Sequence, residues 1–302
     1  MKLSKSQAAG LSVFSNLTLA LLKLVIGILS GSMTIIAESA HSGFDLLASL
    51  IAYFSVRMSD QPPDQEHPYG HSKIENISGI LEASLIFLVS IWIFYQAFHK
   101  IIDKKFEVTN LPIGIAIMIF SLFANIFVSR LLYRVARERN SIALEADAAH
   151  LWSDVLTSGG AILTLAIIYI SDKFFSVKLF LLDPIFSMVI ALWILGIAYR
   201  LTRKSYPALL DGRAKPEMEK RLIYLIQEFC QGRCQYHKLR TRQSGAKIYV
   251  DFHLQFMPDT HIETAHLLSH DLKKKIEAEI AGSDVIIHLE PFEDETEVAL
   301  RK

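Results

Sequence analysis

The sequence lacks an excess of charge of either sign. Its 31 Lys and Arg residues equal its 31 Asp and Glu residues, so the formal net charge at pH 7 is zero. Without a basic excess, binding to nucleic acid is not expected. The polarity of an ordinary soluble domain is also missing, because 51% of the 302 residues are hydrophobic and the mean hydropathy is +0.32. The composition therefore predicts a protein of the lipid bilayer.

Long apolar runs fill the first two thirds of the chain. We expect six membrane-spanning helices, because each run has roughly the 20 residues that a helix needs to cross a hydrocarbon core of about 30 Å. The runs are 8–29, 33–57, 74–98, 112–133, 142–170 and 179–199. The first run carries Asn16 and Lys23 and lacks a small-residue cleavage pattern after it, so we interpret it as a retained helix and not as a signal peptide.

Lys and Arg are shared unevenly between the two sets of short connections, which predicts the orientation in the membrane. Eleven lie on one side, namely Lys2, Lys5, Arg57, Lys73, Arg130, Arg134, Arg137, Arg139, Arg200, Arg203 and Lys204, and five on the other, namely Lys100, Lys104, Lys105, Lys173 and Lys178. We therefore expect both termini in the cytoplasm and, without an organelle signal, a place in the plasma (inner) membrane. Cys230 and Cys234 then lie on the reducing side, where we expect free thiols in preference to a metal site or a structural disulfide.

The chain changes character near Pro207. We expect a membrane domain over 1–206 and a cytosolic domain over 207–302. Periodicity predicts two helices and three strands in the second part, in the order αββαβ: helices at 216–229 and 263–280, and strands at 236–243, 246–256 and 283–292. This order makes a small α+β domain, which at about 95 residues is long enough to bury a core of its own.

Two pairs of ionisable residues lie inside apolar runs. His41 and Asp45 are four residues apart in the second run, and His150 and Asp154 repeat that spacing in the fifth. Residues with this spacing lie on one face of a helix. Because an ionisable side chain at the centre of a membrane helix costs roughly 2.5 to 3.5 kcal/mol, two matching pairs indicate a function. Facing antiparallel helices could bring all four side chains together.

Two imidazole nitrogens and two carboxylate oxygens suit a tetrahedral divalent ion, zinc first. Magnesium and calcium prefer six or more oxygen ligands and fit poorly. The empty site carries two negative charges in a medium of low dielectric constant, so a metal or protons must neutralise it, and occupancy by one excludes the other. A bundle that exposes the site to each side in turn would exchange metal for protons, and histidine, with an ordinary pKa of about 6.5, suits the proton half.

Four stretches together resemble the cation diffusion facilitator family, namely AESAHSGFD, DQEHPYGHSKIE, EADAAHLWSDVLTS and LRTRQSGAKIYVDFHLQF. The resemblance covers nearly the whole chain. It implies six transmembrane helices with cytoplasmic termini, a ferredoxin-like cytosolic domain, a homodimer, and efflux of zinc or related ions against inward protons. It also implies that His41, Asp45, His150 and Asp154 form the transport site. One bacterial branch has aspartate in place of His41, so this chain is similar instead to the zinc-selective branch.

The same resemblance implies further functional residues. A loop site would consist of Asp64, His67 and His71, and Lys73 and Asp211 would take part in a charge network that links the membrane halves to the tails. Regulatory zinc would bind in the tail among His237, His253, His266, His288 and Glu290, the last where relatives often have aspartate. The chain lacks the histidine-rich insert that some relatives carry between the fourth and fifth spans, so metal collection by that loop is not expected.

Other classes of function remain open. A broader-specificity exporter would carry cadmium, iron, manganese or cobalt. An intramembrane metalloenzyme is disfavoured, because the tail stretch HIETAH at 261–266 separates its histidines by five residues instead of four, and four protein ligands at the membrane site leave no position for an activated water. A membrane-anchored metal sensor would need one span and no buried ligands. We therefore expect a transporter of zinc and protons and not an enzyme.

Overall fold

In the computed structural model of the chain, residues 3–30, 33–103, 112–175 and 181–292 are described. Four residues of the charge count, Lys2, Lys104, Lys105 and Lys178, lie outside the described residues, as does the start of the sixth predicted run at 179–180. The chain divides into two compact units, Met1–Tyr206 and Pro207–Lys302. Each unit is described by itself below.

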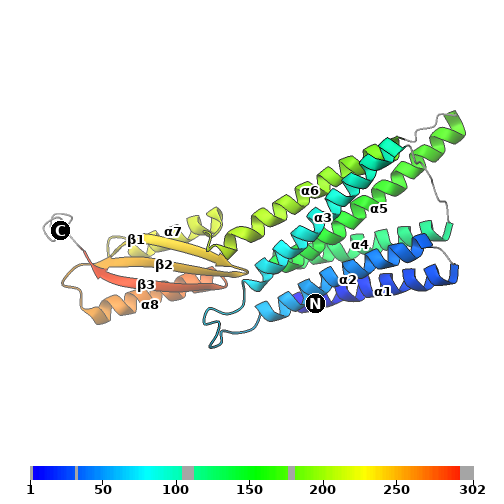
Figure 1. Cartoon of the computed structure of the whole chain (residues 1–302). Helices are drawn as coiled ribbons and strands as arrows, with labels where there is room; N and C mark the ends of the chain where they lie inside the picture. The colour runs from blue at the N-terminus through cyan, green and yellow to red at the C-terminus, as the bar shows by residue number, and fades with distance from the viewer. Residues whose placement is uncertain (1–2, 31–32, 104–111, 176–180, 293–302) are drawn as a thin grey trace. The chain divides into compact units, whose positions relative to one another are not determined.

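The first unit is a bundle of six helices (Figure 1). They are α1 (Lys5–Ser30), α2 (Met33–Ser59), α3 (Ile74–Asp103), α4 (Pro112–Arg139), α5 (Ile142–Phe175) and α6 (Leu182–Leu209). Each of the first five helices contains one predicted run, and α6 contains most of the sixth, so the prediction of six helices is confirmed. The helices extend beyond the apolar runs because good helix formers such as Arg continue them, as at the end of α4.

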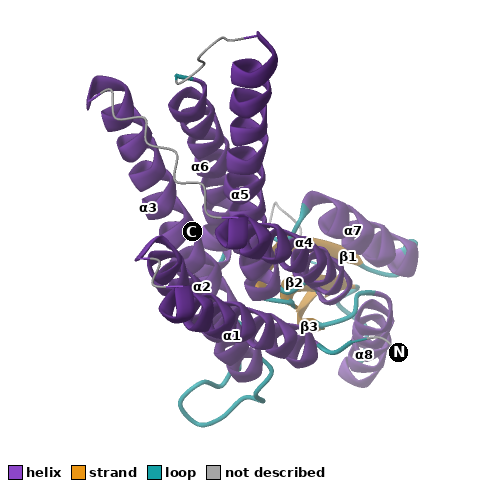
Figure 2. Cartoon of the chain, turned by 90° about the vertical axis from the view of Figure 1, so that its right-hand side faces the viewer, coloured by secondary structure: helices purple, strands orange, loops and turns teal. Residues whose placement is uncertain are grey.

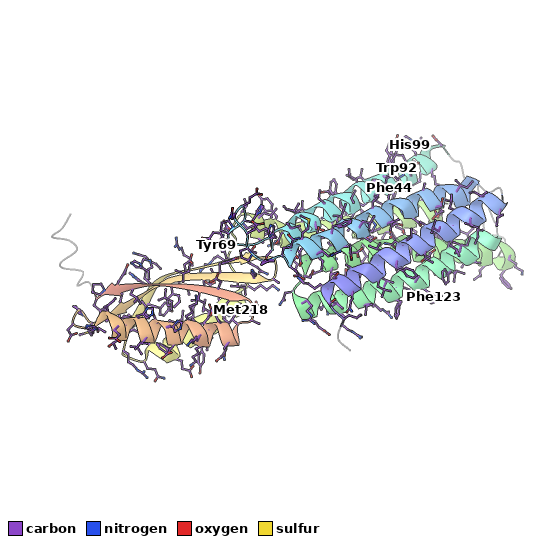
Figure 3. All side chains as sticks on the ribbon, turned by 90° about the horizontal axis from the view of Figure 1, so that it is seen from below. Phe44, Tyr69, Trp92, His99, Phe123 and Met218 are labelled. Carbon is purple, nitrogen blue, oxygen red and sulfur yellow. A yellow bond between two sulfur atoms is a disulfide. The ribbon has the colours of Figure 1, made fainter. Side chains whose placement is uncertain are left out.

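Five of the described helices are long and apolar enough to cross a membrane, by length and composition: α1, α3, α4, α5 and α6. The remaining helix, α2, has 27 residues and carries Glu38, His41 and Asp45. Large apolar side chains lie on the outside of the bundle, as Phe44, Trp92 and Phe123 illustrate in Figure 3. An exposed apolar surface of this extent is suited to lipid and not to water.

Small side chains fill the inside of the bundle, and α5 lies at its centre. On one side, Ala143 and Ala148 of α5 pack with residues of α1, α2 and α4. On the other side, Ala146 and Ala149 pack with residues of α3 and α6. Because α5 is covered on both sides, polar residues on it are buried unless they face a cavity.

The second unit is a three-stranded sheet with two helices. Its elements are α7 (Pro216–Cys230), β1 (Gln235–Ser244), β2 (Lys247–Phe256), α8 (Ile262–Glu279) and β3 (Ser283–Pro291). The strand order is β1-β2-β3, with β1 antiparallel and β3 parallel to β2. Figure 2 shows the strands beside α7 and α8. The predicted αββαβ order of a ferredoxin-like domain is confirmed.

The sheet has one apolar face and one polar face, because successive residues of a strand point to opposite sides. Val250, Phe252 and Leu254 of β2 are fully buried against Leu225 of α7 and Leu272 of α8. The residues between them on β2 point to the other face. That face carries histidines, and the register sets His237 opposite His253 and His253 opposite His288.

Cys230 and Cys234 are paired as a disulfide, so the expectation of free thiols is wrong. The chain reverses after α7 in a turn that contains Gly232 with a φ of +82°, a conformation that glycine adopts readily. This reversal leaves the two Cα atoms 4.9 Å apart, within the range for a disulfide. The spacing of four residues alone does not reveal such a reversal.

Candidate metal sites

Four side chains converge between α2 and α5. His41 and Asp45 are one helical turn apart on α2, and His150 and Asp154 are one turn apart on α5. The Oδ1 atom of Asp45 lies 3.3 Å from Nε2 of His150 and 3.9 Å from Nε2 of His41. Ligand atoms of His41, Asp45 and Asp154 all lie within 4.8 Å of one another. The two helices thus bring both predicted pairs into one cluster.

The separations in this cluster are close to those around a tetrahedral ion. Nitrogen and oxygen ligands at about 2.0 to 2.1 Å from zinc are about 3.3 to 3.4 Å apart. The His150–Asp45 separation of 3.3 Å already has this value. The His41–Asp45 separation of 3.9 Å exceeds it by about 0.5 Å, which a small change of side-chain torsion closes.

One oxygen of the cluster has no hydrogen-bond partner among the described residues, namely the buried Oδ2 of Asp154. An unpaired buried acceptor is costly, and a bound cation would give it a partner. Access is open on one side, because Asp154 and His41 line a cavity of about 880 Å³ whose walls also include residues of α3. The side chain of His41 is 48% exposed, whereas that of His150 is only 8% exposed.

Asp64, His67 and His71 form a second cluster between α2 and α3. The carboxylate of Asp64 reaches both histidines, with Oδ1 at 3.4 Å from Nδ1 of His67 and Oδ2 at 3.3 Å from Nε2 of His71. The backbone N–H of Gly70, whose φ is +81°, donates to the carbonyl oxygen of His67 and closes a turn. The backbone N–H of His67 donates to Oδ1 of Asp64 at 2.6 Å, and this hydrogen bond lowers the pKa of the Asp64 carboxyl. The carboxyl is therefore anionic at neutral pH and available to a cation.

A third cluster lies on the polar face of the sheet. The ring centroids of His237 and His253 are 5.1 Å apart, and those of His253 and His288 are 4.8 Å apart. Glu290 follows His288 by two residues and so shares its face. Its two oxygens lie 2.7 Å from Nε2 of His237 and 2.5 Å from Nδ1 of His253. Burial raises the pKa of Glu290, but the hydrogen bonds to the two histidines outweigh burial, so the pKa is lower than usual.

His266 does not join this cluster within one chain. Helix α8 buries Ala265, Ser269, Leu272 and Ile276 against the sheet, which leaves His266 exposed. Its ring stacks instead beside that of His270, with a centroid distance of 6.1 Å. A metal-binding role for His266 therefore stays a prediction.

The pairing of Lys73 with Asp211 also stays a prediction, because the two residues belong to different units. Within the second unit, Asp211 has a φ of +53°, and its Oδ1 accepts a hydrogen bond from Nη1 of Arg242 at 3.1 Å. Within the first unit, the carbonyl oxygen of Lys73 accepts hydrogen bonds from the N–H groups of Asn76 and Ile77 at the start of α3.

Glu75 is a buried carboxylate that sequence reasoning missed. Its Oε1 accepts hydrogen bonds from Nζ of Lys5 and Oγ of Ser59, both at 2.9 Å, and its Oε2 accepts one from Oγ of Ser141 at 2.6 Å. These contacts join the ends of α1, α2, α3 and the segment before α5. An acidic residue inside an apolar run could have indicated this buried carboxylate. Glu82 and Asp147 are also acidic residues inside apolar runs, and both are fully buried.

A helical bundle with an apolar exterior and an ionisable ligand cluster inside it defines a membrane protein that handles metal cations. Comparison with known proteins identifies it further. The family described as the cation efflux transmembrane domain matches residues 10–210, and the family described as the cation efflux protein cytoplasmic domain matches residues 214–292. The chain therefore belongs to the cation diffusion facilitator family of cation efflux transporters.

Individual relatives agree with this assignment. The chain is 32% identical to the cation-efflux pump FieF of Cronobacter sakazakii over 263 residues, which cover 87% of this chain and 84% of that protein. It is 29% identical over 286 residues to an uncharacterized transporter, sll1263, of Synechocystis sp., and covers 90% of it. A solved structure of the zinc form of CzrB, a candidate zinc transporter, is 34% identical but covers only 26% of this chain, with a TM-score of 0.25.

Proposed function

We propose that this cation efflux transporter carries zinc out of the cytoplasm in exchange for protons. His41, Asp45, His150 and Asp154 form its transport site. The main support is the convergence of two imidazoles and two carboxylates at separations near those of tetrahedral zinc. The family relationship supports cation efflux, and the set of two nitrogen and two oxygen ligands favours zinc among the cations.

Exchange for protons follows from the charge of the site. Two carboxylates buried between membrane helices carry two negative charges, which must be neutralised when the metal leaves. Protons on the same groups supply that neutralisation, and metal and protons therefore compete for them. A proton gradient directed into the cell then favours release of the metal on the outside.

The two units have different roles in this proposal. Residues 1–206 form the transport domain, in the plasma membrane with both chain termini in the cytoplasm. Residues 207–302 form a cytosolic domain that senses metal and joins two copies of the chain as a homodimer. The cluster of His237, His253 and Glu290 would bind regulatory zinc there, and the cluster of Asp64, His67 and His71 would bind zinc at the mouth of the transport domain.

Broader specificity is the second candidate function. The side chain of His41 is 48% exposed towards the cavity, so one of the four ligands is free to move and to admit ions larger than zinc. The name of the FieF relatives specifies a cation-efflux pump and no particular metal. Cadmium and ferrous iron are the ions to test beside zinc.

The decisive experiment measures ion flux in proteoliposomes. Zinc uptake driven by a pH gradient is recorded with a zinc-sensitive dye, with and without a protonophore. We expect flux in the wild type that collapses with the gradient and is absent in Asp154→Ala. Asp183→Asn is the control, because this carboxylate forms an ion pair with Lys100 elsewhere in the bundle. Flux in Asp154→Ala above about half of the wild-type rate contradicts the proposed site, and flux independent of the gradient contradicts proton exchange.

A further inference from the structure

A buried lysine lies beside the transport site. Lys23 of α1 has only 9% of its side chain exposed. Its Nζ donates a hydrogen bond to Oγ of Ser42 on α2 at 2.9 Å. The same Nζ lies 3.5 Å from Oε2 of Glu38, at the outer limit of a hydrogen bond. An ammonium group inside a membrane bundle is costly, so its place next to the site requires a reason.

Glu38 extends the ligand face of α2 by one turn. It precedes His41 by three residues and Asp45 by seven, so the three side chains lie along one face of the helix. Glu38 lines the same cavity of about 880 Å³ as His41 and Asp154, and its side chain is 45% exposed. Lys23 is not among the described residues that line this cavity. The carboxylate thus faces the route to the site, and the ammonium lies away from that route.

The contact between Lys23 and Glu38 does not have the geometry of a pair that only holds helices together. A structural ion pair is short and shielded on both sides. Here the short contact of Lys23 is to the neutral Ser42, whereas the contact to Glu38 is long and Glu38 is half open. The ammonium can therefore leave Glu38 and keep a hydrogen bond to Ser42.

The charges around the site need a resident cation. Glu38, Asp45 and Asp154 bring three carboxylates to one region, and the ammonium of Lys23 lies beside the first of them. A divalent ion at this point of the route would therefore meet an ammonium that competes for the same oxygens.

We propose that Glu38 is an additional ligand for the transported cation, and that Lys23 is a tethered cation which takes the place of the ion on Glu38. This inference rests on the proposed transport function. The ion passes between Glu38 and the pair of His41 and Asp154. When it binds Glu38, the ammonium of Lys23 withdraws to Ser42, and when the ion leaves, the ammonium returns. Lys23 thereby lowers the affinity of Glu38 for the ion, so that the ion is released again.

A double-mutant cycle of zinc affinity tests the proposal. Full-length protein in lipid nanodiscs carries alanine at His67, His71, His237 and His253, so that the loop and tail clusters do not contribute. Zinc affinity is measured by competition with a chromophoric chelator for Lys23→Met, Glu38→Gln and the double variant. A unit charge about 4 Å from a carboxylate is worth more than a factor of ten at an effective dielectric constant of about 20. We therefore expect Lys23→Met to bind zinc at least about tenfold more tightly, and Glu38→Gln to remove this gain.

The outcomes separate the possible roles of the pair. An unchanged or weaker affinity in Lys23→Met, or a gain that persists in the double variant, overturns the proposal. Should Lys23→Met not fold, Glu38→Gln alone decides, because an unchanged affinity in that variant also overturns it. Lys100→Met is the matched control, since Lys100 forms an ion pair of 3.4 Å with Asp183 that does not line the cavity, and its affinity should equal that of the background.

Failure of the proposed function gives a different result. Asp154→Ala in the same background removes a ligand of the transport site itself. If its zinc affinity is unchanged, the transport site is wrong, whatever the cycle gives. If it falls while the cycle shows no coupling, the transport site stands and only the role of Glu38 and Lys23 is overturned.

Discussion

Asp45 joins the two halves of the proposed transport site, because its Oδ1 lies near both histidines. The change Asp45→Asn keeps the shape of the side chain and removes its charge. It also leaves the link between α1 and α2 in place, since Nδ2 of Asn16 donates to the backbone carbonyl oxygen of Asp45 and not to its side chain. Its effect on metal binding can therefore be separated from its effect on folding.

The magnitude of this effect has a lower bound. Loss of a group that only supports a metal ligand typically costs about 10- to 100-fold in metal affinity. Asp45 contributes a charged ligand atom itself, so we expect zinc affinity to fall at least about 100-fold, or about 2.8 kcal/mol at 1.4 kcal/mol for each factor of ten. Folding should not suffer, because a buried amide in a membrane helix costs less than a buried ionised carboxylate.

Two measurements on the same purified protein check this reasoning. In the background with alanine at His67, His71, His237 and His253, competition with a chromophoric chelator gives the zinc affinity of the remaining site, and a thermal melt without metal gives the stability of the bundle. We expect a large loss of affinity in Asp45→Asn with a melting temperature equal to or above that of the wild type. Asp183→Asn should change neither quantity. A zinc affinity within about tenfold of the wild type would refute the assignment of Asp45 as a ligand, and a lower melting temperature would show that its carboxylate is mainly structural.

Three further outcomes are expected. His41→Asp replaces a nitrogen by an oxygen and adds a negative charge, which favours ions that accept more oxygen ligands. In competition flux assays, the flux of cadmium and of ferrous iron should therefore rise relative to that of zinc. An unchanged ratio of these fluxes would show that His41 does not select the ion. The pKa of Glu290 is lowered in the folded tail because the hydrogen bonds to His237 and His253 outweigh burial, so its contribution to stability is present above its ordinary pKa and lost as the pH falls through the lowered value. Hydrogen exchange in β2 and β3 of the full-length protein should accelerate over that acid range, and less so in Glu290→Gln; equal acceleration in both would contradict the assignment. Leu225→Ala empties a fully buried position and should lower the free energy of unfolding of the tail by about 2 to 5 kcal/mol in the same experiment, whereas Tyr224→Ala, at a neighbouring position that is 53% exposed, should cost far less.

Much of the fold could be predicted from the sequence, because its signals are local. Apolar runs of membrane length define the six helices, and alternation defines β2, whose even-numbered residues Val250, Phe252 and Leu254 form the core of the tail. The pairing of His41 with Asp45 and of His150 with Asp154 could also be predicted, since residues one helical turn apart lie on the same face of a helix. That the pairs face one another depends on the packing of α2 on α5, which the repeated spacing suggested.

The remaining features depend on contacts between distant parts of the chain. Lys23 and Glu38 are 15 residues apart on different helices, and no spacing rule connects them. The pairing of Cys230 with Cys234 depends on the reversal at Gly232. His266 was grouped with the other tail histidines by resemblance, yet the apolar face of α8 turns it away from them within one chain. The residue type shows which chemical interactions each of these side chains can make. Only the packing of the folded chain determines which residue it contacts.

The two separate cores of the bundle have a mechanical consequence. One core joins α1, α2, α4 and α5, the other joins α3, α5 and α6, and the partly buried Tyr133 of α4 packs against both. The cavity that reaches His41 and Asp154 is walled by α2 and α5 on one side and by α3 and Ile194 of α6 on the other, so it opens between the helices of the first core and the pair α3 and α6. A tilt of α3 and α6 away from α2 widens or narrows the entrance. It leaves the first core packed as before, but it moves α3 and α6 against Ala146 and Ala149 of α5 in the second core. The free energy required for such a tilt is then set by the contacts of α3 and α6 with α5 in the second core, and not by the cohesion of the first core.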